Sequence, residues 1–343
     1  MGSKTMKALQ LQGIGKLELV DIDPPQVADD QLLIRTGAAV ICTSDLNDIR
    51  ENPFGIALPV VMGHEAAGTV AQVGRGVKGF APGDRVAAHP VHPCGRCANC
   101  RSGVGHLCAD MGHLGLNMQG AFAECFVVRA DRARRVPADM PFHQAALAEP
   151  VCVCLEALAQ ARLRPGSNLL ILGDGPFGVL IAMLARALPR TRTVIVGHHD
   201  FRLAFAQGAV AVNSHKTPDL AAALGTAADG EGYDAAILAV GRAEAARLGL
   251  ELLKPKGRLV VFSSLPGPTP VDLFRLHVRE LEIVGACNDD NRLDEAVARL
   301  CDPSLGLGRL VTHRFPIEQF RAAFDLAAAG HQQAMKVALE FAS

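Results

Sequence analysis

Residues able to bind a metal ion gather in one stretch, Cys42 to Glu65. The stretch opens with Cys-Thr-Ser-Asp at 42–45 and closes with Gly-His-Glu at 63–65. Thiolate and imidazole are ligands that zinc prefers, and a catalytic zinc site needs only three protein ligands and an open position. The stretch therefore predicts a metal site. The alternative is a buried cysteine and an ordinary hydrogen-bonded histidine that never meet.

A second metal motif follows, with the spacing C-x2-C-x2-C-x7-C, at Cys94, Cys97, Cys100 and Cys108. Four thiolates this close together indicate a closed, tetrahedral, structural zinc site. The commonest iron–sulfur run has three residues and a proline around its last cysteine, and this one does not. A nucleic-acid-binding zinc ribbon would need two widely spaced C-x2-C pairs. Free thiols or two disulfides remain an alternative, less suited to an intracellular chain.

Glu149 lies in an apolar neighbourhood, Leu147-Ala148-Glu149-Pro150. A buried carboxylate is costly unless it is paired with a charge or bound to a metal. Glu149 could instead cap a helix or form a salt bridge, because Pro150 is well placed as a first helical residue.

A glycine-rich turn marks a change of pattern in the middle of the chain. The apolar run 168–172 leads directly into Gly173-Asp174-Gly175-Pro176-Phe177-Gly178 and then into a helix through Leu188. Between a buried strand and a helix, G-x-G-x-x-G is a dinucleotide-binding fingerprint, because the glycines let the backbone approach a pyrophosphate at the helix N-terminus. The alternative is a tight turn without a ligand.

The elements around these motifs predict two domains of different class. The first third alternates short strands with glycine turns, which favours a small distorted β-barrel. From 167 to about 285 strands alternate with helical runs, at 201–208, 217–225 and 243–253 among others, which predicts a doubly wound parallel sheet. The tail, 292–343, is expected to hold two helices and two short strands.

Composition excludes several classes of function. The chain has 343 residues, a net charge of −1 and no long Lys/Arg block, which argues against nucleic acid or an anionic membrane as partner. No apolar run is long enough to span a membrane, and no signal-peptide pattern is present. Ten cysteines in such a chain favour metal binding over disulfides, and we expect a cytoplasmic protein.

These motifs, in this order, resemble the zinc-dependent medium-chain alcohol and polyol dehydrogenases over nearly the whole chain. The resemblance rests on five further markers besides the glycine-rich turn: 42–45, 63–65, Gly83-Asp84-Arg85-Val86, the four-cysteine loop and Glu149-Pro150. It implies that residues 1–150 and 290–343 form a GroES-like catalytic domain. A dinucleotide-binding Rossmann domain, residues 151–289, is inserted between them, with the active site in the cleft.

The resemblance also implies the roles of the site residues. Cys42 and His64 are catalytic zinc ligands, and Glu149 stands at the third ligand position, which is a cysteine in the best-known alcohol dehydrogenases and a glutamate in polyol-type members. Glu65 is a close or alternating ligand, and Asp45 orients a ligand. Two zinc ions per chain are expected. Zinc lowers the pKa of a bound secondary alcohol or polyol, Ser44 takes its proton, and a hydride passes to NAD(P).

The coenzyme choice depends on the end of the second strand of the parallel sheet. NAD-specific members carry an acidic residue there, and this chain reads Gly197-His198-His199, with Asp200 resembling a helix N-cap. Histidines and Arg202 suit a 2′-phosphate, so NADP is slightly favoured over NAD. The expected coenzyme-binding residues are Gly173, Gly175, Pro176, Phe177, Gly178, Gly197, His198, His199, Arg202, Val240, Gly241 and Ser263.

One departure from the family pattern leaves other functions open. The family usually has a histidine five residues after the ligand cysteine, and this chain has Asn47, an amide that cannot relay protons. The alternatives are a metal-free quinone or enone reductase of the same fold, and a redox-sensing or structural relative without activity. The strand segments 257–262 and 281–285 leave an apolar sheet edge, so we expect a homodimer or homotetramer.

Overall fold

A computed structural model describes residues 5–289, 291–329 and 333–342. The described residues form two compact units. The first holds residues 5–152, 291–329 and 336–342, and the second holds 153–289 together with 333–335. None of the helices in these residues is both long and apolar enough to cross a membrane.

The first unit is built mainly from antiparallel strands. Its large sheet has the strand order β10-β6-β5-β3-β18-β17, with β9 also paired to β3, and a smaller sheet has the order β2-β1-β4. The strands are β1 (Met6–Gly13), β2 (Lys16–Ile22), β3 (Gln31–Val40), β4 (Val60–Val61), β5 (Glu65–Val73), β6 (Arg85–Ala88), β7 (Val91–His92), β8 (Gly112–His113), β9 (Cys125–Arg129), β10 (Ala133–Arg135), β17 (Val311–Pro316) and β18 (Lys336–Glu340).

Strand β3 organises this unit because β5, β9 and β18 all pair with it. Its apolar side chains Leu32 and Ile34 are fully buried, whereas Arg35 is exposed, as expected for a strand with one face on a core. Short helices complete the unit: α1 (Thr43–Glu51), α2 (Ala98–Arg101), α3 (Phe142–Ala145), α10 (Leu293–Leu300) and α11 (Phe320–Ala329). The predicted GroES-like, mostly β domain is confirmed.

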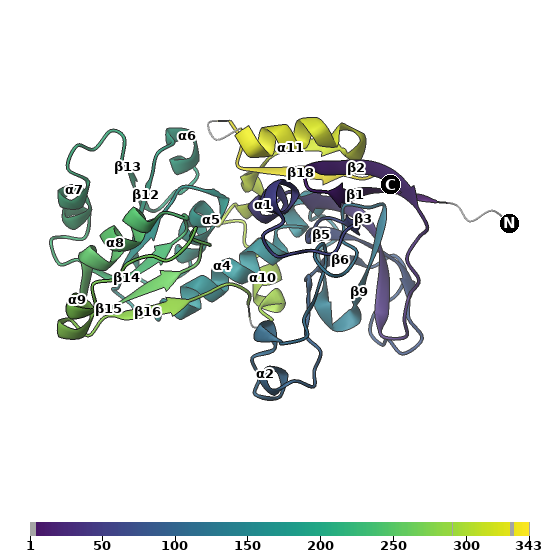
Figure 1. Cartoon of the computed structure of the whole chain (residues 1–343), viewed down its shortest axis with the longest axis horizontal. Coiled ribbons are helices and arrows are strands. Elements are labelled where there is room, and N and C mark those ends of the chain that lie inside the picture. The colour runs from purple at the N-terminus through teal and green to yellow at the C-terminus, as the bar shows by residue number, and fades with distance from the viewer. Residues whose placement is uncertain (1–4, 290, 330–332, 343) are drawn as a thin grey trace. The chain divides into compact units, whose positions relative to one another are not determined.

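The second unit is a six-stranded parallel sheet with the order β13-β12-β11-β14-β15-β16. In Figure 1 β14, β15 and β16 lie side by side. The strands are β11 (Asn168–Leu172), β12 (Arg192–Gly197), β13 (Val210–Asn213), β14 (Tyr233–Leu238), β15 (Leu253–Val261) and β16 (Glu282–Gly285). Every residue of β11 is buried, as its apolar run predicted for a central parallel strand. The Rossmann expectation is confirmed.

The helices of the parallel-sheet unit are shorter than the sequence suggested in two places, because the helix expected through Leu188 also ends early, at Ala185. They are α5 (Pro176–Ala185), α6 (Asp200–Leu203), α7 (Leu220–Ala227), α8 (Ala243–Leu252) and α9 (Leu273–Val278), while α4 (Ala148–Gln160) joins the two units. The helical run expected at 201–208 ends early, because the N–H groups of Phe205 and Ala206 bond to carbonyls only three residues back. That prediction was wrong in its length.

Candidate metal centres and coenzyme loop

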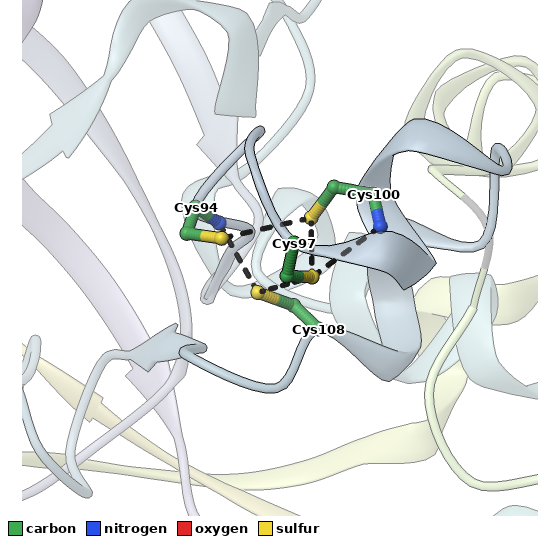
Figure 2. A group of neighbouring side chains, drawn as sticks. All are labelled: Cys94, Cys97, Cys100 and Cys108. Atoms are coloured by element: carbon green, nitrogen blue, oxygen red, sulfur yellow. Dashed lines mark hydrogen bonds between the residues drawn. The ribbon is translucent and has the colours of Figure 1, made fainter.

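The four cysteines of the C-x2-C-x2-C-x7-C motif converge in the loop around α2, as Figure 2 shows. Their sulfur atoms all lie within 4.8 Å of one another. The Sγ–Sγ distances are 3.5 Å for Cys97–Cys100, 3.8 Å for Cys97–Cys108 and 4.0 Å for Cys94–Cys100. A zinc–sulfur bond of about 2.3 Å places tetrahedral sulfurs about 3.8 Å apart. The cluster therefore fits a zinc ion closely.

The electrostatics of this cluster also indicate a cation. Backbone N–H groups of Cys100 and Ala109 lower the pKa of Cys97 to about 6. Desolvation and the neighbouring Cys97 thiol raise the pKa of Cys100 to about 12. Four thiolates cannot share this volume without a positive charge, and zinc supplies one. No disulfide joins any of the ten cysteines, all of which lie in the described part of the chain.

The second candidate centre begins where β3 gives way to α1. Cys42 is the N-cap of α1, and its N–H donates to Asp45 Oδ2 at 2.8 Å. The other oxygen of Asp45 lies 3.2 Å from His64 Nδ1. Asp45 is buried and therefore ties the cysteine to the histidine of the other segment. Ligand atoms of Cys42, His64 and Glu65 lie within 4.8 Å of one another.

Asp45 also determines which nitrogen of His64 is available. Because Nδ1 faces the Asp45 carboxylate, Nε2 is the nitrogen left for a metal. Burial lowers the pKa of His64, but Asp45 and Cys42 together raise it well above its usual value. Burial and Glu65 raise the pKa of the Cys42 thiol. Without a cation this group of side chains therefore holds protons that a metal would displace.

Ser44 lies in the same site, with Oγ 3.4 Å from His64 Nε2. Asn47, three residues further along α1, contacts another residue of the same helix. Its Oδ1 accepts a bond of 3.1 Å from Arg50 Nη2 at the surface of α1. The amide that replaces the family's histidine therefore takes part in an exposed helix contact.

Glu149 occupies the first turn of α4 and is buried. Its Oε2 has no hydrogen-bond partner among the described residues. Burial raises the pKa of Glu149 to about 7, and Glu65 adds to the rise while His64 opposes it. Glu149 is not part of the group of ligand atoms within 4.8 Å of one another. Its orphaned oxygen and its electrostatic contact with His64 nevertheless fit a carboxylate that awaits a cation.

Lys336 is a residue of this site that sequence reasoning missed. It begins β18, is 2 % exposed, and donates to both carboxylate oxygens of Glu65, at 2.6 and 2.5 Å. Burial lowers the pKa of Lys336, but Glu65 and Cys42 raise it above its usual value. A lysine at the head of an apolar strand, Lys-Val-Ala-Leu, was the available signal.

The glycine-rich turn has the geometry of a phosphate-binding loop. A Cβ on Gly178 would lie 2.0 Å from Gly173 O, and one on Gly173, whose φ is +120°, would lie 2.8 Å from Ala239 O. Gly175 is the N-cap of α5 with open space around it, and Pro176 is the first helical residue. The turn therefore presents the backbone at a helix N-terminus, which fits a pyrophosphate.

The other expected coenzyme residues lie at the carboxyl ends of the parallel strands. Val240 and Gly241 follow β14, with the Val240 side chain close to Gly173, and Ser263 follows β15 and donates its N–H to Leu238 O at 3.0 Å. The Phe177 ring lies edge-on to Phe262, with centroids 5.6 Å apart. The carboxyl edge of such a sheet is where dinucleotides bind.

The segment after β12 differs from expectation at Asp200. Asp200 is not the N-cap of α6; that position is His199, and the Asp200 carboxylate binds Lys216 Nζ and Asn213 Nδ2 instead. Lysine and asparagine from the β13 side offer Asp200 stronger partners than helix N–H groups do. Arg202, expected to face a phosphate, is 9 % exposed, and its burial lowers its pKa.

Comparisons with known proteins agree with this architecture. Residues 28–138 match the alcohol dehydrogenase GroES-like domain, and residues 176–302 match the zinc-binding dehydrogenase domain. The chain is 32% identical to an L-threonine 3-dehydrogenase of Anaeromyxobacter dehalogenans over 90% of this chain and 91% of that protein. It is 30% identical to a sorbitol dehydrogenase of Bombyx mori over 96% of this chain and 97% of that protein.

Two solved structures share the fold over almost their whole length. A putative zinc-binding dehydrogenase of Sinorhizobium meliloti bound to NADP superposes with a TM-score of 0.92 at 27% identity, covering 98% of this chain and 99% of that one. An alcohol dehydrogenase of Escherichia coli CFT073 complexed with NADH also superposes with a TM-score of 0.92, at 26% identity, covering 99% of this chain and 100% of that one.

Proposed function

Because the chain belongs to the zinc-binding medium-chain dehydrogenases and is a zinc-dependent, NAD(P)-linked alcohol or polyol dehydrogenase, we propose a role for each residue of its two metal centres. Cys42, His64 and Glu149 hold the catalytic zinc, and Glu65 is the carboxylate beside them. The four cysteines of 94–108 hold a structural zinc, so each chain takes two ions. The observation that carries this proposal is the convergence of Cys42, His64 and Glu65 beside the orphaned Glu149 oxygen.

The residues of the catalytic centre have distinct tasks in this proposal. When bound, zinc lowers the pKa of an alcohol and polarises a carbonyl. Asp45 orients the His64 ring through Nδ1, so that Nε2 would be the nitrogen that holds the ion. Lys336 neutralises the charge of Glu65, so that this carboxylate adds no net negative charge beside the anionic zinc ligands. Ser44 Oγ, next to His64 Nε2, accepts the substrate proton.

A substrate panel tests the activity and names the substrate class. Zinc-loaded protein is mixed with NAD or NADP and with secondary alcohols, sugar alcohols and L-threonine, and absorbance at 340 nm is followed. We expect turnover of at least one member, abolished by a zinc chelator. Reduction of quinones or enones that continues after chelation would favour the metal-free reaction instead. No turnover of any substrate by protein with two zinc ions would contradict the assignment.

The choice between NAD and NADP depends on the residues at the end of β12. The sequence favours NADP slightly, through His198, His199, Arg202 and the side-chain-free Gly197. The two superposed structures hold NADP in one case and NADH in the other, so the coenzyme class is NAD(P). Neither the NADP preference expected from the sequence nor the expected cytoplasmic location is tested by these similarities. Residues 1–150 and 290–343 are proposed to carry the catalysis, and 151–289 to bind the coenzyme.

We further propose that the chain forms a homodimer or homotetramer through β16. This strand ends the parallel sheet and exposes Ile283 by 40%, and the neighbouring helix α9 exposes Leu273, Phe274 and Val278 by more than half. An apolar edge strand is a template for pairing with another copy.

Ile283→Lys should therefore lower the sedimentation mass at micromolar concentration. The matched control is Val210→Lys, because Val210 is 48% exposed on β13, the opposite edge of the same sheet. The control should leave the mass unchanged. A wild-type mass of one chain, or an equal response of both variants, would contradict the proposal.

A further inference from the structure

The carboxylate that lies at the end of β12 comes from another segment, because no residue at the end of that strand is acidic. The side chain is Asp174, from the glycine-rich turn. A Cβ built on Gly197 would lie 2.3 Å from Asp174 Cβ and 2.6 Å from its Oδ2. Asp174 therefore fills the volume in which a side chain at position 197 would begin. The room that Gly197 leaves is taken, which removes one reason for expecting a 2′-phosphate there.

The Asp174 carboxylate is held in place by the residues after β12. Its Oδ2 accepts from the N–H groups of His198 at 2.8 Å and His199 at 2.7 Å, and lies 3.0 Å from His199 Nδ1. All three of these bonds are to Oδ2, and none of them is to Oδ1. Burial raises the pKa of Asp174, but the bonds from His199 and His198 lower it below its usual value. The group is therefore an anion at neutral pH.

Arg202, which is 9 % exposed, is the cation whose charge acts on Asp174, and the polar groups at the surface of this segment have other partners. Burial and the stacked His215 ring, with centroids 4.3 Å apart, lower the pKa of His198, so it is uncharged at neutral pH. His198 Nδ1 is also engaged with Ser214 Oγ at 2.7 Å. Asp200 points at Lys216 and Asn213. Asp174 is thus the carboxylate that a ribose would meet at the strand end.

We propose that Asp174 is the residue that determines coenzyme specificity, its carboxylate binding the 2′-hydroxyl of the adenosine ribose and disfavouring a 2′-phosphate, so that the protein prefers NAD. In the usual arrangement the strand end itself supplies this carboxylate; here the glycine-rich turn supplies it from across the β11–β12 pair. A phosphate next to a buried carboxylate loses affinity through like-charge repulsion. The inference rests on the proposed function, because it concerns the coenzyme of that reaction.

Direct binding tests the inference without any alcohol substrate. NADH and NADPH fluorescence is titrated with the zinc-loaded, full-length protein, which yields a Kd for each coenzyme. We expect the wild type to bind NADH about tenfold or more tightly than NADPH. Asp174→Asn keeps the shape and removes the charge, and should shift the Kd ratio towards NADPH by about tenfold. Asp200→Asn is the matched control and should leave the ratio unchanged.

A relocation variant keeps the test decisive if Asp174→Asn folds poorly. Asp174→Gly with Gly197→Asp moves the carboxylate to the strand end and removes the Cβ that a side chain at 197 would meet at 2.3 Å, and should restore the preference for NADH. A wild type that binds NADPH as tightly as NADH, or a ratio that Asp174→Asn leaves unchanged, overturns the inference while the activity assignment stands. Failure of the substrate panel with normal NADH binding contradicts the activity and supports the inference.

Discussion

Glu149→Ala is expected to lose the catalytic zinc and retain the structural one. Metal analysis should fall from two zinc ions per chain to one, and kcat/KM should fall by more than about 100-fold. The basis is that removing even an outer partner of a metal ligand costs about 10- to 100-fold in affinity or activity. Glu149→Cys provides a matched variant, because a thiolate is also a zinc ligand. It should keep two zinc ions per chain.

The metal-free protein gives a second readout for Glu149. Its raised pKa of about 7 means that the folded chain binds more protons than the unfolded chain between the usual glutamate value of 4.5 and 7. The free energy of unfolding of the metal-free protein should therefore fall as pH rises through this window. Glu149→Ala should remove that decline. A variant that keeps both zinc ions and near-normal activity would show that Glu149 is not a ligand.

Cys100→Ser is expected to release the structural zinc while the catalytic zinc stays bound. The loop at 94–108 contains one short helix and one 3-10 turn, so the metal holds it in place of a hydrophobic core. We expect the melting temperature to fall by about 5 °C or more, which corresponds to about 2 kcal/mol for a unit of this size. Differential scanning calorimetry together with zinc analysis measures both effects.

The control for this variant is Cys301→Ser, an exposed cysteine at the end of α10. It should change neither the zinc content nor the melting temperature, because a serine at an exposed site removes no buried contact. If Cys100→Ser behaves like Cys301→Ser, the four cysteines do not form a structural zinc site. Loss of both zinc ions from Cys100→Ser would show instead that the two centres depend on each other.

Local patterns were sufficient to predict the class of each domain and the four-cysteine metal site, and the resemblance of the motifs to a known family implied the reaction. The four cysteines lie within 15 residues, so short-range spacing alone brings their sulfurs together. The buried run of β11 followed by three glycines predicted a strand, a turn and a helix that follow one another along the chain. Hydrophobic periodicity and backbone sterics act over such short distances, and the sequence shows them directly.

Contacts between distant segments decided the rest. Lys336 and Glu65 are 271 positions apart and meet only because β18 and β5 both pair with β3. Asp174 reaches the end of β12 because β11 and β12 are neighbours in the parallel sheet. The charge that each of these groups meets depends on strand register and on the direction of the side chain. No local pattern encodes the strand register or the direction of a side chain. The tertiary structure alone therefore decides which cation pairs with the Glu65 carboxylate and where the coenzyme loop places the Asp174 carboxylate.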